Sequence, residues 1–581
     1  MQYAADFETT TDPEDCRVWA WGLCPVNNRD NYIYDNQIDT FFHYLHEQPD
    51  NMKIWFHNLR FDGEFIICYL FKEGYKFVKD KKDLEDKSFT TLISDKGIFY
   101  CMTVVFEKKN KKVHKVEFFD SLKVLPFSLA AIAKGFSLPV KKLSIDYDKA
   151  RKIGYELNKK EQQYLKNDVV ILAMALNILF LQNLTRMTTG SNALHNFKST
   201  MSEYRFDRLF PPPEYDELIR ESYKGGYTYL NSKYKGKDCG PGIVLDVNSL
   251  YPSVMRYKML PFGEGVHYIG EYQKSRNYSL YIQTFKCQFE LKKGFIPTIQ
   301  LKKNLSFMAT EYVTSSKNEE ITLCLTSVDM DLFFKHYDVF NVEFMEGWKF
   351  RGYCGLFDDY IDKWVDIKNQ ATIDGNNAMR TLSKLMLNSL YGKFSSSPKG
   401  RSKYPVDDHG AVRYIVGELE DRKPVYIPVG TFITAWARHV TISAAQQLYD
   451  RFIYADTDSL HLTGLQLPSS LEIDKVKLGA WKHELNFRTA RFVRQKTYME
   501  QVEISCKDYK KLEIAEKRKT DLIDGKHYQW KVVCAGMPEK LHEQVDFSNF
   551  HEGSSYEGKL RPVHCVGGVV LMNTDFTIRK G

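Results

Sequence analysis

Two acidic residues alternate near the start of the chain, in the run Tyr3–Thr10, where Asp6 and Glu8 flank Phe7. If this run forms a strand, its two-residue period places both carboxylates on one face and the phenyl ring on the other. Carboxylates held this close repel each other, and the run offers no Lys or Arg to neutralise them. A divalent cation is the natural partner for such a pair. By itself the pattern is weak evidence, because Asp-x-Glu is common by chance.

Two further acids each stand four residues after a polar residue, a spacing that brings side chains to one face of a helix. They are Asp62, after Asn58, and Asp168, after Tyr164. With the first pair they would give enough oxygen ligands for two hard cations, and Tyr164 could orient a water for in-line attack on a phosphodiester. The alternative is that both acids are helix-surface charges and that Tyr164 is an ordinary half-buried ring.

A third group of acids begins where an apolar run ends in Asp246 and Val247, and a helix is expected to start near Pro252. Free backbone N–H groups at 249–251 would then face an anion next to the acid. Downstream, Asp456 and Asp458 share one face of a tight turn. The three acids together indicate a site for phosphate and metal, whereas the downstream pair alone would be more typical of a solvated turn.

Between these acids, a helical run places Lys384, Asn388 and Tyr391 on one polar face. A lysine on that face can neutralise a polyphosphate, while the aromatic ring can meet a base or a sugar. The alternative interpretation is an amphipathic surface helix.

Both strands and helices would position these residues. Strand-like runs at 243–245 and 452–455 alternate with helical patterns at 161–181 and 378–394. This alternation predicts an α/β or α+β protein. The apolar run Val169–Leu181 is shorter than a membrane span needs, so it is expected to be a core helix.

Two segments are expected to separate elements. Phe210–Pro213 contains three successive prolines, which cannot lie inside a helix or a central strand and so predict a junction. The segment 395–401 is rich in serine and is expected to be an irregular excursion after a helix. The chain has no internal repeat and no low-complexity tract.

The composition is that of a large folded protein. With 581 residues, of which 43% are hydrophobic and 14% aromatic, a disordered or fibrous chain is excluded and several domains are expected. The 81 Lys+Arg and 74 Asp+Glu leave a net charge of only +7, too mild to prove nucleic-acid binding, although lysines cluster at 72–87 and 507–519. Eleven cysteines without a CxxC pair favour a reducing cytosol, and the acidic N-terminus predicts no export signal.

The motifs occur together in an order that resembles a known family. The polymerase-like motifs are Asp246–Pro252, Lys384–Gly392 and Asp456–Asp458, and the nuclease-like motifs are Asp6–Glu8, Asn58–Asp62 and Tyr164–Asp168. They resemble the three polymerase and three 3′→5′ exonuclease motifs of family B DNA polymerases. Further segments are similar to the protein-primed branch, the DNA polymerases of phi29-like phages, namely Tyr223–Gly226, Thr434–Arg438, Lys496–Tyr498 and Cys534–Met537.

The resemblance implies a multidomain α/β (α+β) fold, in which an RNase H-like 3′→5′ exonuclease joins a right-hand polymerase with two family-specific insertions. The expected parts are the exonuclease domain (1–186), the first part of the palm (187–257), a terminal-protein-contacting insertion (258–355), the fingers (356–394), a second insertion for strand displacement and processivity (395–425), the second part of the palm (426–525) and the thumb (526–581).

The resemblance also implies roles for individual residues of the polymerase site. Metal would be held by Asp246, the Val247 backbone and Asp458, with Asp456 alongside as a catalytic acid. The nucleotide would be contacted by Ser249, Leu250, Tyr251, Lys368, Lys384, Asn388 and Tyr391. Among these, Tyr251 would act as a steric gate against ribose. The lysine of the fingers would be Lys368 only if the fingers carry a small insertion, because it stands sixteen residues before Lys384.

The remaining implied roles concern the nuclease site and the DNA strands. Metal and catalysis in the nuclease would rest on Asp6, Glu8, Asp62, Asp168, Tyr164 and Lys142. Single-stranded DNA would be gripped by Thr9, His57, Asn58, Phe61, Ser121 and Leu122. Template or primer strands would be touched by Tyr223, Gly225, Gly226, Thr434, Arg438, Lys496 and Tyr498. Because Lys141 and Lys142 are adjacent, the sequence leaves open which of them serves the nuclease.

The implied activity is DNA-directed DNA synthesis with proofreading, each by phosphoryl transfer with two Mg²⁺ ions per site and Mn²⁺ as a possible substitute. The implied partners are primed template and single-stranded DNA, deoxynucleoside triphosphates and a terminal protein that serves as primer. We expect a monomer without membrane contact in the cytoplasm of an infected bacterium. The alternatives are a nuclease that has lost polymerisation, a DNA-coating protein, and an RNA-primed replicative polymerase of the same family.

Overall fold

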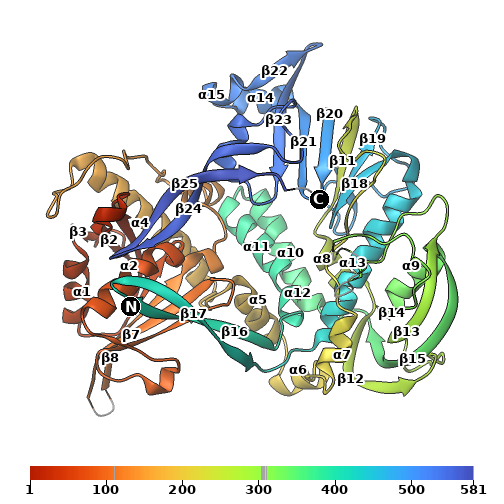
Figure 1. The fold of residues 1–581 in the computed structure, drawn as a ribbon, viewed down its shortest axis with the longest axis horizontal. Coiled ribbons are helices and arrows are strands. Elements are labelled where there is room, and N and C mark those ends of the chain that lie inside the picture. The colour runs from red at the N-terminus through yellow and green to blue at the C-terminus, as the bar shows by residue number, and fades with distance from the viewer. Residues whose placement is uncertain (110–111, 302–305, 307, 309, 580–581) are drawn as a thin grey trace.

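An eight-stranded mixed sheet forms the N-terminal part of the computed structural model, which describes residues 1–581 apart from 110–111, 302–305, 307, 309 and 580–581 (Figure 1). The strands, in spatial order, are β3 (Ile33–Asp35), β2 (Val18–Pro25), β1 (Gln2–Thr9), β4 (Met52–Phe56), β8 (Lys112–Asp120), β7 (Phe99–Lys109), β6 (Ser88–Ile93) and β5 (Lys76–Phe77). Because β1, β4 and β8 run parallel, their carboxyl ends meet at one edge of the sheet.

Helices cover both faces of this sheet. They are α1 (Ile38–Glu47), α2 (Leu59–Lys72), α3 (Leu129–Gly135) and α4 (Lys159–Leu181). On one face Phe7 packs against Phe41 of α1, with ring centroids 5.1 Å apart. On the other face Ala4 shares a core with Val169 of α4. Since alternate residues of a strand share a face, the even-numbered acids of β1 lie on the α4 side.

Helix α4 is the one helix in the described part of the chain that is long and apolar enough to cross a membrane. It has 23 residues, and 61% of its most apolar window is buried inside the protein. Its buried side chains, such as Leu165 and Leu176, pack against the sheet. The helix therefore occupies the core position that its apolar run predicts.

A nine-stranded sheet forms the centre of the second half of the molecule (Figure 1). Its strands are β9 (Thr228–Leu230), β10 (Asp238–Cys239), β11 (Gly242–Val247), β18 (Phe452–Asp456), β19 (Ser459–Thr463), β20 (Trp481–Arg494), β21 (Thr497–Ile504), β22 (Thr520–Ile523) and β23 (Lys526–Cys534). The buried helix α13 (Ile427–Gln447) and the short α8 (Leu250–Tyr257) pack together beside it. Helix α8 begins at Leu250, two residues before the predicted start at Pro252.

The inserted segment after α8 has a core of its own. Its four strands follow the order β12 (Leu260–Ile269), β15 (Tyr337–Tyr353), β13 (Leu280–Leu291) and β14 (Ile321–Thr326), and α9 (Ser327–His336) packs on them. Phe285, Phe289 and Phe333 form part of this separate core. Other residues of the segment, such as Ile282 and Phe350, belong to the larger core that includes α13, so the segment packs on the rest of the molecule.

Two antiparallel helices, α10 (Asp358–Ile373) and α11 (Asn377–Ser389), stand between the two sheets (Figure 1). The helical run predicted for 378–394 is interrupted, because α11 ends at Ser389 and a separate turn, α12 (Tyr391–Phe394), follows. The Ser389 hydroxyl donates a hydrogen bond to the Leu385 carbonyl four residues earlier, an arrangement that bends helices.

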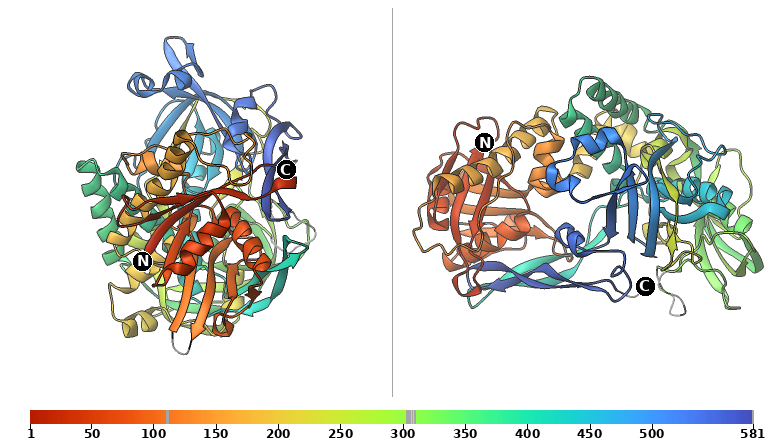
Figure 2. Two further views of the ribbon diagram at one scale, coloured as in Figure 1. Left: turned by 90° about the vertical axis from the view of Figure 1, so that its left-hand side faces the viewer. Right: turned by 90° about the horizontal axis from the view of Figure 1, so that it is seen from above.

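Two long hairpins reach from the second half of the chain to the first. They are β16 (Lys399–Asp408) with β17 (Ala411–Asp421), and β24 (Ser555–Cys565) with β25 (Gly568–Thr577). They contact each other and both contact α2, and Figure 2 shows them running side by side toward the N-terminal sheet. The irregular segment expected at 395–401 is thus shorter than predicted, because β16 already begins at Lys399.

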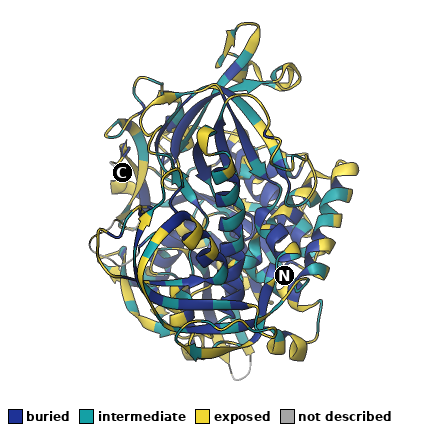
Figure 3. Cartoon of the chain, turned by 90° about the vertical axis from the view of Figure 1, so that its right-hand side faces the viewer, coloured by how far each residue is buried: buried dark blue, intermediate teal, exposed yellow. Residues whose placement is uncertain are grey.

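The remaining helices connect these parts. They are α5 (Thr189–Lys198), α6 (Glu203–Leu209), α7 (Asp216–Glu221), α14 (Cys506–Lys511) and α15 (Ile514–Lys517). The triple-proline stretch 210–213 lies between α6 and α7 and contains no helix or strand, as predicted. Buried residues follow the central strands and helices, whereas exposed residues lie mainly on loops, hairpin ends and outer helix faces (Figure 3).

Candidate active sites

The N-terminal acids converge at the edge where the parallel strands end. One carboxylate oxygen from each of Asp6, Glu8 and Asp168 lies within 4.8 Å of the other two. Asp62, expected in the same cluster, is 3% exposed and lies outside this close group. Burial, followed by the charge of Asp6, raises the pKa of Asp62. The structure therefore brings three of the four predicted ligands together and holds the fourth beside them.

The carboxylates of this cluster are held in an environment that favours their neutral form. Burial, followed by repulsion from Asp168, raises the pKa of Asp6 to about 7. Burial and the charge of Asp6 likewise raise the pKa of Glu8. The Oδ1 atom of Asp168 is buried and has no hydrogen-bond partner among the described residues. An unpartnered buried oxygen beside two further carboxylates fits a divalent cation.

Lys142, and not Lys141, enters the cluster. Its Nζ donates to the Asp168 carboxylate and lies 2.8 Å from the Tyr164 hydroxyl oxygen. The side chain of Lys141 makes no such contact, and its carbonyl accepts a hydrogen bond from Asn167. A second phenol, that of Tyr147, lies with its oxygen 2.7 Å from the Tyr164 oxygen. Of the two adjacent lysines, Lys142 is therefore the one that contacts the acidic cluster.

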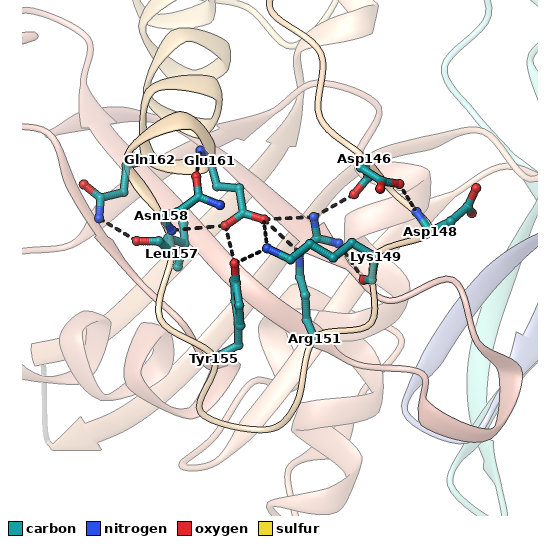
Figure 4. A network of polar contacts seen from close by, with 9 residues as sticks. All are labelled: Asp146, Asp148, Lys149, Arg151, Tyr155, Leu157, Asn158, Glu161 and Gln162. Carbon is teal, nitrogen blue, oxygen red and sulfur yellow. Dashed lines mark hydrogen bonds and ion pairs between the residues drawn. The ribbon is translucent and has the colours of Figure 1, made fainter.

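A capping network positions the start of α4, which carries Tyr164 and Asp168 (Figure 4). Asn158 and Glu161 form a reciprocal capping box, in which each side chain accepts a backbone N–H of the other residue. Arg151 and Tyr155 donate to the same Glu161 carboxylate. The network ties the loop that follows Lys142 to the first turn of the helix.

Asp120, at the end of β8, organises the start of α2. Its Oδ1 accepts hydrogen bonds from the backbone N–H groups of Asn58 (3.1 Å) and Leu122 (3.0 Å), with Leu59 at 3.4 Å. Asn58 is the N-cap residue of α2, yet its own side chain makes no capping bond, and its φ is +79°. The Asp120 carboxylate on β8 therefore caps the helix, and the Asn58 side chain stays exposed and can contact a ligand.

The other residues expected to grip single-stranded DNA divide into two groups. Thr9, Phe61 and Leu122 are partly exposed at this edge of the sheet. Ser121 is fully buried, and its hydroxyl donates to the Phe56 carbonyl; His57 lies 2.9 Å from it. Internal hydrogen bonds thus occupy the side chains of Ser121 and His57, and the expectation that they touch DNA stays a prediction.

The second group of acids lies on strands β11 and β18 of the central sheet and on the turn that joins β18 to β19. Asp246 at the end of β11 pairs in register with Ser459, which in turn pairs with Asp456. The Val247 N–H donates to the Asp458 carbonyl (2.8 Å), and this bond fixes the turn against β11. Thr457 at the turn has a φ of +61°, a conformation that places the flanking acids close together.

The three acids differ in their partners. Asp456 is paired with Lys496, whose Nζ lies 2.6 and 2.9 Å from its two carboxylate oxygens. Burial, followed by the charge of Asp458, raises the pKa of Asp246 to about 7. Burial also raises the pKa of Asp458. Asp246 and Asp458 have no hydrogen-bonded side-chain partner among the described residues, so they are the pair free to hold cations.

These two acids form one wall of a cavity of about 840 Å³. The opposite wall is cationic and comes from α10 and α11, and the predicted nucleotide ligands line the same space. The lining residues include Ser249, Leu250, Tyr251, Lys368, Arg380, Lys384, Asn388, Tyr391, Lys475 and Lys482. Burial and the charge of Lys384 lower the pKa of Lys368, so both lysines face the same space. A cavity with acids on one wall and three cations from α10 and α11 on the opposite wall suits a metal-bound polyphosphate.

Two tyrosines form the floor of this cavity. The rings of Tyr251 and Tyr391 are stacked, with centroids 4.0 Å apart and planes inclined by 19°. Ser249 precedes α8 in a left-handed conformation (φ +54°), and no side chain caps the helix. The first N–H groups of α8 are therefore open toward the cavity, as predicted from the sequence.

A loop at 223–226 lies against the Asp-Thr-Asp turn. A Cβ atom on Gly226 would lie 2.7 Å from the Thr457 hydroxyl, so only glycine fits this close approach. Arg438 of α13 donates to the carbonyls of Lys224 (2.7 Å) and Gly225 (2.8 Å) and pairs with the buried Asp329. The loop is therefore held in place from the helix behind it.

Three side chains expected to touch DNA are instead largely buried. Thr434 is 1% exposed, Arg438 4% and Tyr498 7%. The Thr434 hydroxyl donates within its own helix, and the ring of Tyr498 stacks on Phe492. Their side chains are held by contacts inside the protein, and the expectation that they touch DNA stays a prediction. Tyr223, Gly225 and Lys496 keep partial or full exposure.

Several residues of these sites were not predicted from the sequence. Arg380 stands four residues before Lys384 on the same helix, and that spacing was a signal that could have been used. Asp120, Tyr147, Asp329 and Lys482 gave no local signal, because their partners lie in distant parts of the chain.

Comparison with known proteins decides the family. A family model described as DNA polymerase type B, organellar and viral, matches residues 45–155 and 143–475. The chain is also 45% identical to the DNA polymerase of Bacillus phage M2 over 99% of each chain. The chain belongs to the type B DNA polymerases. The fold expected from the sequence, a mixed α/β multidomain polymerase, is thereby confirmed.

This type B polymerase also matches solved structures over its full length. The phi29 DNA polymerase complexed with primer-template DNA and incoming nucleotide substrates superimposes with a TM-score of 0.92 at 42% identity, and 100% of both chains is covered. The phi29 DNA polymerase complexed with single-stranded DNA gives a TM-score of 0.90 at the same identity and coverage. The polymerase described here is therefore similar to those of phi29-like phages in sequence and in fold.

The raised pKa values of the polymerase predict how its stability depends on pH and on cations. The pKa values of Asp6 and Asp246 are about 7 in the folded chain, against an ordinary value of 3.8. Between these two pH values the folded state thus holds more protons than the unfolded chain does. The stability of the protein without divalent cations should therefore fall as pH rises through about 7. Cations compete with these protons, and Mg²⁺ should raise Tm more at about pH 8 than at about pH 6. Thermal melts with EDTA and with Mg²⁺ measure this; an equal rise at both pH values would contradict it.

Proposed function

We propose that this polymerase replicates a viral genome by protein-primed initiation and strand displacement, and that it proofreads with a separate 3′→5′ exonuclease site. The observation that carries the proposal is the presence of two acid clusters in one chain. Asp246 and Asp458 face a cationic cavity, and Asp6, Glu8 and Asp168 converge in the N-terminal sheet. The full-length similarity to the phi29 DNA polymerase supports it.

In the proposed polymerase site, a primer 3′-hydroxyl attacks the α-phosphate of a deoxynucleoside triphosphate. Asp246, Asp458 and the Val247 backbone would hold two Mg²⁺ ions, or Mn²⁺ in their place, and these ions would stabilise the entering and leaving oxygens. Lys384, Lys368 and Arg380 neutralise the polyphosphate, because they line the opposite wall of the cavity. Asp456, whose charge Lys496 already offsets, serves alongside.

In the proposed exonuclease site, water attacks the terminal phosphodiester. Asp6, Glu8, Asp62 and Asp168 would hold the Mg²⁺ ions that activate this water. Lys142 and Tyr164, which contact each other at 2.8 Å, lie where they can orient the water and offset charge on the phosphate. Thr9, Asn58, Phe61 and Leu122 receive the single strand at the edge of the sheet.

The proposed partners of the protein are DNA and a terminal protein. Primed template and single-stranded DNA are supported by the phi29 complexes that contain them. A terminal protein would bind the insertion at 258–355, and the hairpin within 395–425 would act in strand displacement.

The palm would comprise 187–257 and 426–525, the fingers 356–394, the thumb 526–581 and the exonuclease domain 1–186. Tyr223, Gly225, Gly226 and Lys496 would contact the duplex strands. The protein would act as a monomer in the cytoplasm of an infected bacterium.

The direct test follows a labelled primer annealed to a template, in Mg²⁺, with and without deoxynucleotides. The proposal expects the primer to lengthen with nucleotides and to shorten without them. Replacing the DNA primer by a terminal protein and one nucleotide tests protein priming, which would give a labelled protein. A chain that only lengthens primers would lack the proposed exonuclease, and one that only shortens them would lack the proposed polymerase activity.

Replacing Tyr251 with valine is expected to admit ribonucleotides. The Tyr251 ring is fixed by its stacking on Tyr391, so it can exclude a 2′-hydroxyl by contact. Losing one such exclusion typically changes discrimination by about 10-fold to 100-fold. The measurement compares kcat/KM for dATP and ATP in the wild type and in Tyr251→Val. Tyr391→Phe, which keeps the ring, is the control; unchanged sugar discrimination in Tyr251→Val would refute the gate.

Replacing Asp120 with alanine is expected to slow the degradation of single-stranded DNA about 10-fold while primer extension persists. The carboxylate caps α2 and orders Asn58 and Leu122, and loss of a cap costs about 1 kcal/mol locally. Asp120→Asn keeps an acceptor and should recover part of the rate. Initial rates of both activities at several DNA concentrations measure this. An equal fall in both activities would mean a general loss of structure instead.

A further inference from the structure

A cavity of about 280 Å³, here called the junction cavity, lies where α2 and the β6–β7 turn meet two hairpins from later in the chain. Helix α2, the β16–β17 hairpin and the β24–β25 hairpin all contribute to its lining. The same hairpins contact α2 and each other, and they approach the N-terminal sheet side by side in Figure 2. Residues of both hairpins thus form part of the cavity wall.

Two cations from different segments point to one spot in this cavity. A Cβ atom placed on Gly97 would lie 3.9 Å from the Arg60 guanidinium carbon and 4.0 Å from the Lys403 Nζ. Arg60 belongs to the first turn of α2, and Lys403 belongs to β16. Neither has an ion-pair partner among the described residues. Like charges this close repel each other, so the arrangement favours an anion between them.

The carboxylate of the cavity does not fill that role. Glu64 is 4% exposed; its Oε1 accepts a hydrogen bond from the Tyr414 hydroxyl (2.9 Å), and its Oε2 lies 3.4 Å from the His564 Nδ1. The hydrogen bond that His564 makes with Glu64 raises the pKa of the imidazole, so this residue adds positive charge to the lining. Arg60 and Lys403 therefore remain without a counter-charge from the protein.

The junction cavity adjoins the proposed exonuclease site. Asn58 and Phe61 line it, and Phe61 directly precedes Asp62 in α2. A positive groove beside an exposed aromatic edge is how proteins follow a single strand, with cations on the phosphates and rings on the bases. The spot between Arg60 and Lys403 thus lies along a path that leads to the acids of the nuclease.

We propose that Arg60 and Lys403 bind a phosphodiester of the single strand whose 3′ end occupies the Asp6 cluster, on the 5′ side of the terminal nucleotide. This inference rests on the proposed exonuclease function. The phosphate lies between the two cations, and the hairpins complete the site when they dock on α2. The junction cavity is therefore a DNA subsite built from α2, the β6–β7 turn and the two hairpins.

The test measures binding of a labelled single-stranded oligonucleotide to the full chain in EDTA, by fluorescence anisotropy at several salt concentrations. For Arg60→Ala/Lys403→Ala, Kd is expected to rise about 10-fold at low salt, and the salt slope to fall by about 0.7, the value for one phosphate of a single strand. Lys96→Ala/Lys423→Ala removes the same charge from neighbouring exposed positions outside the cavity and should leave the slope unchanged. Melting curves check that both variants fold.

Three results would overturn the inference: an unchanged salt slope in the Arg60/Lys403 variant, an equal change in the control variant, or a larger loss for a primed duplex than for the single strand. Inorganic phosphate should compete weakly; complete competition at equal concentration would indicate a free-anion site instead. Degradation of the same oligonucleotide in Mg²⁺ is measured separately. If the wild type does not degrade it, the proposed exonuclease function fails, whereas the binding result still decides the subsite.

Discussion

Asp458→Asn is expected to abolish primer extension and to leave the shortening of single-stranded DNA intact. Asp458 lies beside Asp246, and neither is paired with a cation of the protein among the described residues. Asparagine keeps the size of the side chain but removes one of the two charges that would hold the cations. Because bound metal contributes several kcal/mol to such a transition state, the loss should be about a thousandfold or more.

The matched control is Asp456→Asn, which changes the same turn. Its carboxylate is already bonded to Lys496, so its replacement should cost less synthesis than that of Asp458. Extension and degradation are measured on the same preparations with one labelled primer. If Asp458→Asn lost both activities while its melting temperature stayed at the wild-type value, the assignment of separate sites would be wrong.

Asp6→Ala is expected to have the opposite effect: degradation should fall about a thousandfold, and extension should continue. Asp6 shares its oxygen cluster with Glu8 and Asp168, and burial holds its pKa at about 7. Removing it takes away a cation ligand, and it also relieves repulsion inside the cluster. The variant should therefore be at least as stable as the wild type without divalent cations.

Degradation rates and melting curves in EDTA measure both parts of this prediction. Asp83→Ala, which removes an exposed acid from the same part of the chain, is the control and should change neither. A second consequence is that errors made during synthesis should persist in Asp6→Ala. A variant that still shortened primers at the wild-type rate would place the nuclease chemistry elsewhere.

Local patterns predicted the acids well. The alternation of Asp6 and Glu8, the strand that ends in Asp246 and the turn with Asp456 and Asp458 all follow from short-range periodicity, and the structure brings each group to one place. The strands and helices expected at 243–245, 452–455 and 161–181 are present, with slightly wider bounds. These features depend on residues that are neighbours in sequence.

The contacts that hold the sites in place could not be predicted, because they join distant residues. Arg438 binds the loop at Lys224 from 214 residues away, and Lys496 reaches Asp456 from 40 residues away. The exposure of the site residues could not be predicted either, because no local pattern indicates that Arg438 and Ser121 are buried while Asn58 is exposed. A short motif identifies the residue type but not the direction in which the side chain points.

The cap that Asp120 places on α2 has a consequence for the order in which the chain folds during synthesis. The helix begins at Leu59, but its capping carboxylate comes 62 residues after Asn58. On the ribosome, the first turn of α2 stays incompletely bonded until β8 has emerged and paired with β4. The acid on α2 that belongs to the proposed exonuclease site therefore reaches its final position late, and a nascent chain that stops before residue 120 would lack the capped helix.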